Sequence, residues 1–395
     1  MLEQSAEPSA PHCAAADPAR EFKRVVRYAL DQVLYLRDIR DECPLFPQLV
    51  QIEPTNACNL RCVHCHHHRP ADGQRVYTRR MGIMAMPLYH QIIDELAPSR
   101  TAISLNVQGE PTLHPQFLDM VAYAKRQGLH TSVLTNGTRL TPELTAALLR
   151  LGLDRIVFSF DAVDRAIYES IRIKSQFEPT LRNILHFIRV NHEHGHPTHV
   201  CLSMVEQQRN RAHAAAYERY FARLPVDKVF RNPLLNLSGA AGTRGEIDLA
   251  ALQRGPRAHW PICRIAWEYL TVNWDGEASP CPVDVNVVYS LGNVRGSSLH
   301  EIWNNDRMRA FRRAHLTRDY TAIERNGPLC GSCNCLWDPT YDLRAVEEHV
   351  VESIYRTAVQ HAHTLMPRVP LDQDERYHDL LGEIEKLEPA CEGVR

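Results

Sequence analysis

Two patterns of apolar and polar positions alternate along residues 47–233 of this chain, one typical of strands and one of helices. Short apolar runs that predict β-strands lie at 47–55, 101–109, 130–137, 154–161, 198–206 and 227–233. Stretches with apolar residues at helical spacing lie between them, at 87–98, 114–128, 141–152, 177–195 and 213–224. This repeat of strand and helix predicts a parallel sheet with crossover helices, either barrel-like or doubly wound.

Residues typical of helix ends support these helices. Pro87 suits the first turn of the helix at 87–98, and Thr141 is a cap for the helix at 141–152, with Glu143 in its first turn. Gly128 stands just past the end of another predicted helix. In parallel sheets of this kind, ligands bind at the carboxyl ends of the strands, so we expect the chemistry there.

The pattern changes after a Gly- and Ala-bearing connection at 239–255. Residues 268–284, "EYLTVNWDGEASPCPVD", predict a hairpin with Asp275-Gly276 as its turn. A helix is predicted over 299–316, followed by the cysteine-rich "PLCGSCNC". This region has few long apolar runs, so a metal cross-link would add to its stability.

The two ends of the chain have patterns of their own. Residues 1–19 are rich in Ala, Pro and Ser and are expected to be disordered. Amphipathic helices are predicted over 21–41, 342–362 and 374–388.

Composition narrows the function classes. The 395 residues carry a formal net charge of -2 and no basic block with interleaved aromatics, which argues against nucleic-acid binding. No apolar run reaches the ~18 residues of a membrane helix, and the N-terminus has no secretory pattern, so we expect a cytoplasmic protein. In that compartment twelve cysteines, eight of them in two groups, indicate metal or iron–sulfur ligation.

The first cysteine group, "NACNLRCVHCHHHRP" at 56–70, has the spacing C-x3-C-x2-C. A zinc site lacks a nearby fourth thiolate, and a thioredoxin-like pair would leave Cys58 unexplained. A histidine-rich metal tract is supported by composition alone. The fourth hypothesis is a [4Fe-4S] cluster on Cys58, Cys62 and Cys65, whose fourth iron is open to an exogenous ligand.

This motif, placed after a first strand, resembles that of the radical S-adenosylmethionine (SAM) superfamily, and the resemblance extends to about residue 235. It implies a partial (β/α)6 barrel. It also implies that SAM chelates the open iron and that an electron from the cluster cleaves SAM to a 5′-deoxyadenosyl radical, which abstracts hydrogen. A flavodoxin- or ferredoxin-type protein is the expected electron donor.

The resemblance also assigns SAM contacts at the ends of successive strands. Gln108-Gly109-Glu110 resembles a G-G-E motif that holds the methionine amino group, with Gln in place of the first Gly. Arg172 is expected to face the SAM carboxylate, and His64 to pack on adenine. The remaining expected contacts are Thr135, Asn136, Ser159, Asp161, Val205 and Asn210. His66, His67 and His68 are interpreted as a polar loop over the cluster rather than as substrate or proton-transfer residues.

The second cysteine group reads Cys263-x17-Cys281, then Cys330-x2-Cys333-x1-Cys335. A zinc ribbon is one interpretation, since two thiolate pairs suit tetrahedral zinc. The sequence from 263 to 333 also resembles the SPASM extension of radical SAM enzymes, or its shorter twitch form. That resemblance implies an auxiliary [4Fe-4S] cluster on Cys263, Cys281, Cys330 and Cys333. For Cys335 three roles are considered, an alternative ligand, a persulfide site and a structural thiol, of which we expect the last.

These resemblances divide the chain into four parts. We expect a start with an N-terminal helix at 1–47, the barrel at 48–238, the twitch domain at 256–340 and a helical extension at 341–395.

Two classes of substrate are considered. A small polyhydroxylated metabolite, such as a sugar, aminocyclitol or nucleoside in antibiotic biosynthesis, is favoured because only about 45 residues precede the barrel. The alternative is a maturase that modifies a ribosomally made peptide. If the substrate is oxidised through the auxiliary cluster, a base is needed nearby, and Asp284 and Glu268 are the expected residues.

Overall fold

The computed structural model describes residues 40–43, 46–67, 77–99, 101–237, 246–248, 252–253, 256 and 259–337. The helices predicted over 342–362 and 374–388 lie outside these residues, as do residues 1–39. Arg40 and Asp41, the last two residues of the helix predicted over 21–41, are not helical.

Six parallel strands form the first part of the sheet. They are β1 (Leu49–Ile52), β2 (Ala102–Leu105), β3 (Thr131–Thr135), β4 (Arg155–Ser159), β5 (His199–Glu206) and β6 (Lys228–Pro233). Each pairs in parallel with its neighbour in sequence, in the order β6-β5-β4-β3-β2-β1. The predicted α/β fold with a parallel sheet is therefore confirmed.

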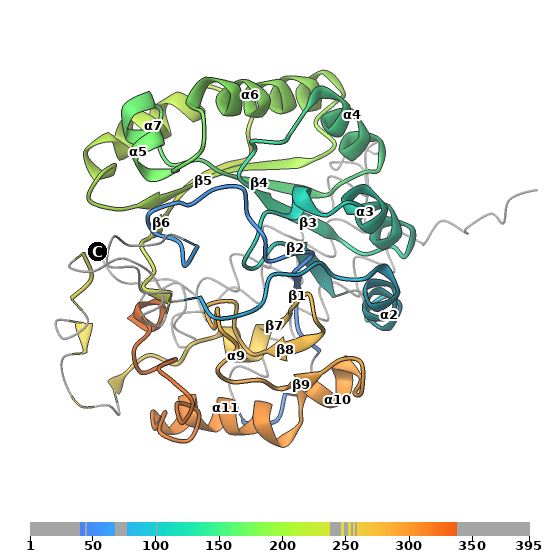
Figure 1. The fold of residues 1–395 in the computed structure, drawn as a ribbon, viewed down its shortest axis with the longest axis vertical. Helices are drawn as coiled ribbons and strands as arrows, with labels where there is room; N and C mark the ends of the chain where they lie inside the picture. The colour runs from blue at the N-terminus through green and yellow to red at the C-terminus, as the bar shows by residue number, and fades with distance from the viewer. Residues whose placement is uncertain are drawn as a thin grey trace, which may run out of the picture. The chain divides into compact units, whose positions relative to one another are not determined.

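The crossover helices are amphipathic and lie along the outer side of the sheet (Figure 1). In α6 the buried residues Thr180, Ile184, Phe187, Ile188 and Asn191 recur at helical spacing. The helices are α2 (Met86–Leu96), α3 (Phe117–Arg126), α4 (Pro142–Arg150), α5 (Arg165–Ile171), α6 (Phe177–Glu193) and α7 (Ala214–Phe221), with short 3-10 turns at Pro111–Leu113 and Arg211–His213. Thr141 caps α4 as predicted, because its side chain accepts a hydrogen bond from the Leu144 amide.

The predicted hairpin forms, and it extends the same sheet. Strand β7 (Tyr269–Val272), preceded by the one-turn helix α9 (Ile265–Glu268), pairs in parallel with β1. Strand β8 (Glu277–Ser279) returns antiparallel to β7, and β9 (Gly292–Asn293) follows as the last of nine strands. Gly276 has φ +89° in the turn, a backbone conformation that L side chains rarely adopt.

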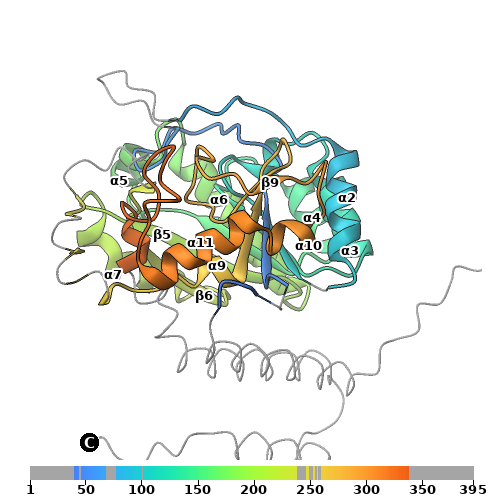
Figure 2. The ribbon, with the colours of Figure 1, turned by 90° about the horizontal axis from the view of Figure 1, so that it is seen from below.

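Two details differ from the sequence prediction. The helix predicted over 299–316 is two helices, α10 (Leu299–Trp303) and α11 (Asp306–Thr317), which Figure 2 shows one after the other. The break occurs because the Asn305 side chain accepts a hydrogen bond from the Met308 amide and caps a new helix. Helix α5, which was not predicted, begins at a similar cap on Asp164. A 3-10 turn at Asn334–Trp337 ends the described part of the chain.

None of the helices in the described residues has the length and apolar character that a transmembrane helix needs.

Replacing Asn305 with Ala tests the cap between α10 and α11. The change removes the cap and the bond from Asn305 Nδ2 to the Leu291 carbonyl, 2.7 Å long. We expect the free energy of unfolding to fall by about 1–2 kcal/mol, measured by urea denaturation under anaerobic conditions. Asn305→Asp keeps the cap and should recover part of the loss. Equal stability of all three proteins would contradict this account.

Candidate SAM and iron–sulfur sites

The cysteine loop that follows β1 is held in place by the segment 77–82. Asn56 Nδ2 donates to the Tyr77 hydroxyl and to the Arg80 carbonyl, each at 2.7 Å, and Asn56 Oδ1 accepts from the Gly82 amide at 2.8 Å. The Thr55 hydroxyl donates to the Gly82 carbonyl at 2.6 Å. These side chains are buried, so their hydrogen bonds hold the loop against the segment 77–82.

The three thiols of this loop share one environment. Cys58 Sγ accepts from the Leu60 amide at 3.4 Å and from Asn136 Nδ2 at 4.0 Å, and Cys62 Sγ accepts from Arg172 Nη1 at 3.8 Å. Burial raises the pKa of Cys58 to about 11 and that of Cys65 to about 12. Iron binds thiolates, so cluster assembly would release the protons of these thiols.

Gly109 lies where the end of β2 meets the cysteine loop. A Cβ at this position would lie 2.2 Å from the Thr55 carbonyl oxygen and 2.6 Å from that of Ala57. The next amide, Glu110 N, donates to the Ala57 carbonyl at 2.9 Å. Glycine is required here by this backbone contact.

The Glu110 carboxylate connects the ends of β2 and β3. Its Oε1 accepts from the hydroxyls of Thr135 and Thr112, each at 2.7 Å, and its Oε2 accepts from the Asn136 amide at 2.8 Å. Burial raises the pKa of Glu110, while these three partners act to lower it. The predicted SAM contacts Glu110, Thr135 and Asn136 are thus in one hydrogen-bonded group.

A buried ion pair lies at the ends of β4 and β5. Arg172 Nε donates to Asp161 Oδ2 at 2.5 Å, and Arg172 Nη2 donates to the Ser159 hydroxyl at 2.6 Å. Burial alone would raise the pKa of Asp161, but the charges of Arg172 and His64 lower it overall. Asp161 is fully buried and forms an ion pair with Arg172, which lies beside Cys62.

The remaining predicted SAM contacts close the same edge. Asp161 Oδ1 accepts from the Val205 amide at 2.9 Å. Asn210 is fully buried and donates to the carbonyls of Asp161 and Val205, each at 2.9 Å. His64 Nδ1 lies 3.2 Å from Gln207 Nε2. The structure brings all the predicted SAM contacts to the carboxyl ends of β2 to β5. Among them, the buried Asn210 side chain bonds to backbone carbonyls and is not exposed at the surface of the site.

The second group of cysteines also comes together. Cys263, Cys281, Cys330 and Cys335 each interact electrostatically with Cys333, and the Cys335 thiol is hydrogen-bonded to Cys333. Burial raises the pKa of Cys263 to about 12. Cys335 therefore belongs to the same cluster of thiols as the four predicted ligands.

The groups that the two sites could hold follow from the side chains present. Among the described residues, no three His, Cys, Asp or Glu side chains converge as the ligands of one metal ion would. A [4Fe-4S] cluster spreads its ligands over separate irons, and cysteine thiolates are its usual protein ligands. Three grouped thiols beside Arg172, and the group of five thiols that includes Cys333, fit that ligand set.

His315, on the buried face of α11, was not predicted as a functional residue. Its Nε2 lies 3.4 Å from Cys330 Sγ, and its Nδ1 has no hydrogen-bond partner. Burial and the charge of Arg318 lower its pKa to about 3, so the imidazole is neutral. His315 follows Met308 and Phe311 at helical spacing. A histidine on this apolar face of the helix was therefore the one sign of its burial in the sequence.

The two predicted bases lie in different places. Glu268 directly precedes β7, which is parallel to β1, so it lies at the opposite end of the sheet from the cysteine loop. It pairs with Arg264 at 3.2 Å, and burial raises its pKa to about 7. Asp284 follows Cys281, and its two oxygens accept from the amides of Val288 and Tyr289 at 2.8 and 3.0 Å.

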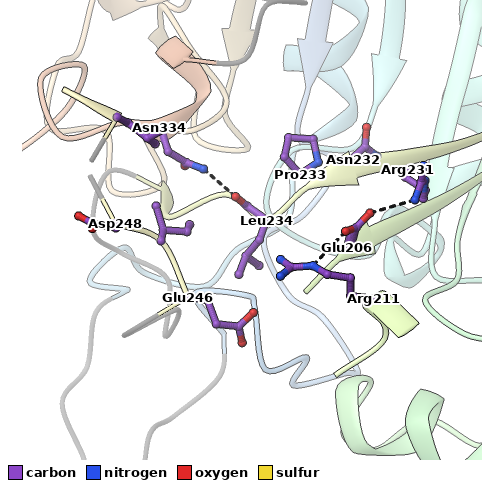
Figure 3. A pocket seen from close by; sticks show the side chains of 11 residues that line it. Glu206, Arg211, Arg231, Asn232, Pro233, Leu234, Glu246, Asp248 and Asn334 are labelled. Atoms are coloured by element: carbon purple, nitrogen blue, oxygen red, sulfur yellow. Dashed lines mark hydrogen bonds and ion pairs between the residues drawn. The ribbon is translucent and has the colours of Figure 1, made fainter. Parts of the chain in front are cut away.

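An open cavity of about 610 Å³ lies beyond the ends of β5 and β6. Figure 3 shows Glu206 between Arg211 and Arg231, and Asn334 reaching the Leu234 carbonyl. Glu246 and Asp248 add acidic groups to the lining. In the sequence, Asn334 stands between Cys333 and Cys335, and Glu206 directly follows Val205.

Comparison with known families identifies both halves of this arrangement. Residues 52–205 match the model of the radical SAM superfamily, and residues 263–334 match that of an iron–sulfur cluster-binding domain, SPASM. This chain contains a radical SAM domain followed by a SPASM domain. Its cofactors are therefore SAM, a [4Fe-4S] cluster in the radical SAM domain and auxiliary iron–sulfur clusters in the SPASM domain.

The radical SAM–SPASM chain has relatives over most of its length. It is 28% identical over 321 residues, 72% of this chain and 86% of the relative, to the tungsten-containing aldehyde ferredoxin oxidoreductase cofactor-modifying protein of Pyrococcus furiosus. It is 25% identical over 310 residues, 71% of this chain and 74% of the relative, to the mycofactocin maturase MftC of Mycobacterium tuberculosis.

A solved structure shares the fold. That of Streptococcus suis SuiB bound to the precursor peptide SuiA has a TM-score of 0.56 and 13% identity, and the match covers 78% of this chain and 74% of SuiB. At this identity the likeness concerns the fold alone.

Replacing Gly109 with Ala tests the contact that joins β2 to the cysteine loop. The new methyl group would overlap two carbonyl oxygens, so we expect a loss of stability of about 1–3 kcal/mol or more, measured by thermal denaturation. Gly296→Ala is the control, because its nearest neighbour is 4.0 Å away. Equal melting temperatures for the two variants would contradict the packing described.

Proposed function

We propose that this radical SAM–SPASM protein is a maturase-type enzyme that abstracts a hydrogen atom from a peptide substrate. When bound, the reduced cluster and SAM supply the carbon radical that removes this hydrogen. The observation that carries the reaction class is the convergence of Cys58, Cys62 and Cys65 with Glu110 and Arg172 on one edge of the sheet.

The residues of this edge have distinct proposed roles. The Glu110 carboxylate is an acceptor for the ammonium group of SAM, and the Arg172 guanidinium is a donor for its carboxylate. Asp161 and Ser159 hold Arg172 in its rotamer through bonds of 2.5 and 2.6 Å. Because Glu110 and Arg172 are both buried, their attraction for a zwitterionic group is weakly screened by water.

A peptide is the favoured class of substrate. The relatives that span most of this chain include a named maturase, and a structure with the same fold holds a precursor peptide. The cavity beyond β5 and β6 is open to solvent and presents both cationic and anionic side chains, which suit a polar chain passing across it.

A small polyhydroxylated metabolite is the second candidate. The cavity volume of about 610 Å³ is within the usual range for small-molecule sites, and its carboxylates and amides can bind hydroxyl or ammonium groups. For either substrate, we propose Asp284 rather than Glu268 as the carboxylate on the substrate side, because the loop of Asp284 lies nearer the SAM site. The Pro282 carbonyl of that loop bonds to Gln108.

Transfer of deuterium distinguishes the two substrate classes. The reconstituted enzyme would be incubated with SAM, a reductant and either a perdeuterated aminocyclitol or a precursor peptide encoded beside its gene and deuterated in its side chains. We expect deuterium in 5′-deoxyadenosine, measured by mass spectrometry, with the peptide alone. Deuterium from the aminocyclitol would reverse this order, and none from either would contradict the proposal.

Iron content tests the two clusters separately. Two [4Fe-4S] clusters predict about eight iron per chain after anaerobic reconstitution. Cys281→Ala should reduce this to about four while some SAM cleavage remains, and Cys62→Ala should abolish cleavage. Zinc in place of four of the irons would support the ribbon interpretation instead.

Asp284→Asn tests whether this carboxylate positions the loop or acts on the substrate. An amide nitrogen would face one of the two backbone amides that Asp284 accepts, leaving a buried donor unpaired, at a cost of about 1–3 kcal/mol. We expect iron content to fall because the Cys281 loop is loosened. Full iron content with loss of product would identify Asp284 as a base. Wild-type iron content together with wild-type product formation would exclude both roles.

A further inference from the structure

Gln108 occupies a position between the two cysteine loops. Its side-chain Nε2 donates to the carbonyl oxygen of Pro282 at 2.5 Å, across 174 positions in sequence. Pro282 directly follows Cys281. Gln108 directly precedes Gly109 at the SAM edge, by which we mean the carboxyl ends of β2 to β5 with the first cysteine loop. One side chain thus connects the loop of the first site to the loop of the second.

His67 extends this connection to the first cysteine group. Its Nε2 lies 2.8 Å from the backbone oxygen of Gln108. A carbonyl oxygen can only accept, so His67 carries its proton on Nε2 and donates. His67 is two residues after Cys65, and the path from Cys65 to Cys281 therefore passes through two hydrogen bonds and short stretches of backbone.

The backbone around Gln108 is constrained on both sides. Val107 has φ +81°, a conformation that is an outlier for a β-branched residue. Gly109 is pressed against the Thr55 and Ala57 carbonyls. A strained residue persists where its surroundings hold it, and such strain is concentrated at functional sites. Here the strained residue directly precedes Gln108, whose side chain donates to Pro282.

Aromatic rings pack around the same junction. The ring centroids of His66 and His67 lie 4.2 Å apart, and that of Tyr77 lies 4.5 Å from His66. Tyr77 packs against Val285 of the auxiliary loop, and the Thr78 amide donates to Asn286 Oδ1 at 2.8 Å. These contacts exclude water from a bridge whose two polar side chains are 7% and 8% exposed.

We propose that Gln108 and His67 are positioning residues that set the auxiliary-cluster loop, residues 281–287, at a fixed place against the SAM site. The proposal rests on the two cluster sites of the proposed function. A glycine at position 108 would leave the Pro282 carbonyl without this donor. The Gln108 side chain is therefore a direct hydrogen-bonded link between the two sites, and His67 joins the first cysteine loop to Gln108.

Gln108→Glu tests the bridge in the reconstituted full-length protein. The carboxylate has nearly the same shape but cannot donate to Pro282, and its charge is repelled by that carbonyl. We expect amide hydrogen exchange in 281–287, including the bonded amides of Asp284 and Val287, to quicken about fivefold, as the loss of one hydrogen bond would give. The magnetic interaction between the two reduced clusters, measured as spin relaxation by EPR, should also change.

Gln91→Glu is the matched control. Gln91 Nε2 donates to the Val294 carbonyl at 2.7 Å, so it too connects the barrel to the SPASM region, but from an exposed position on helix α2. We expect wild-type exchange in 281–287, wild-type spin relaxation and unchanged SAM cleavage. An equal change in both variants would show a general loosening and overturn the proposal.

A second variant covers misfolding of Gln108→Glu. Gln108→Asn keeps a neutral amide but is one methylene too short to reach Pro282, so it should quicken exchange in the same loop. If the Gln108 variant that folds shows wild-type amide exchange in 281–287 and wild-type spin relaxation of the clusters, the proposed bridge is wrong. A wild-type protein with only four iron would instead contradict the proposed function, while the exchange measurement would still decide the bridge.

Discussion

The approach of the β2 end to the cysteine loop is the contact on which both sites depend. Gly109 has no Cβ, so its backbone can lie against the Thr55 and Ala57 carbonyls, and the next amide bonds to Ala57. This contact places Glu110 within reach of Thr135 and the Asn136 amide. Without it, neither the SAM edge nor the link to the auxiliary loop would have its present geometry.

Buried charge is concentrated beside the thiols. Removing Arg172 and Asp161 from water is costly, and their close ion pair offsets part of that cost. A second such pair joins Glu53, at the end of β1, to Arg79 at 2.8 Å, and the Trp274 amide also donates to Glu53. The cysteine loop and the hairpin turn are therefore held by charges that are satisfied only when both are folded.

Much of the fold could be predicted from residue patterns. Each strand of the barrel and the hairpin at 268–284 was visible in the sequence, because burial imposes a period on apolar positions. The break at Asn305 and the helix at 165–171 were missed, since single capping side chains decide them. The continuation of the sheet from β1 into β7 was also missed, because pairing between residues 220 apart leaves no local signal.

The sequence by itself determined the order of elements, the cysteine spacing and the residues at successive strand ends, since these follow from local periodicity and from motif. Only the tertiary structure decided which of them touch. It assigned Asp161 to Arg172, brought Cys335 and His315 to the other auxiliary cysteines, and separated Glu268 from the SAM edge. It also joined His67 and Gln108 to Pro282, because hydrogen bonds between distant loops depend on packing rather than on local sequence.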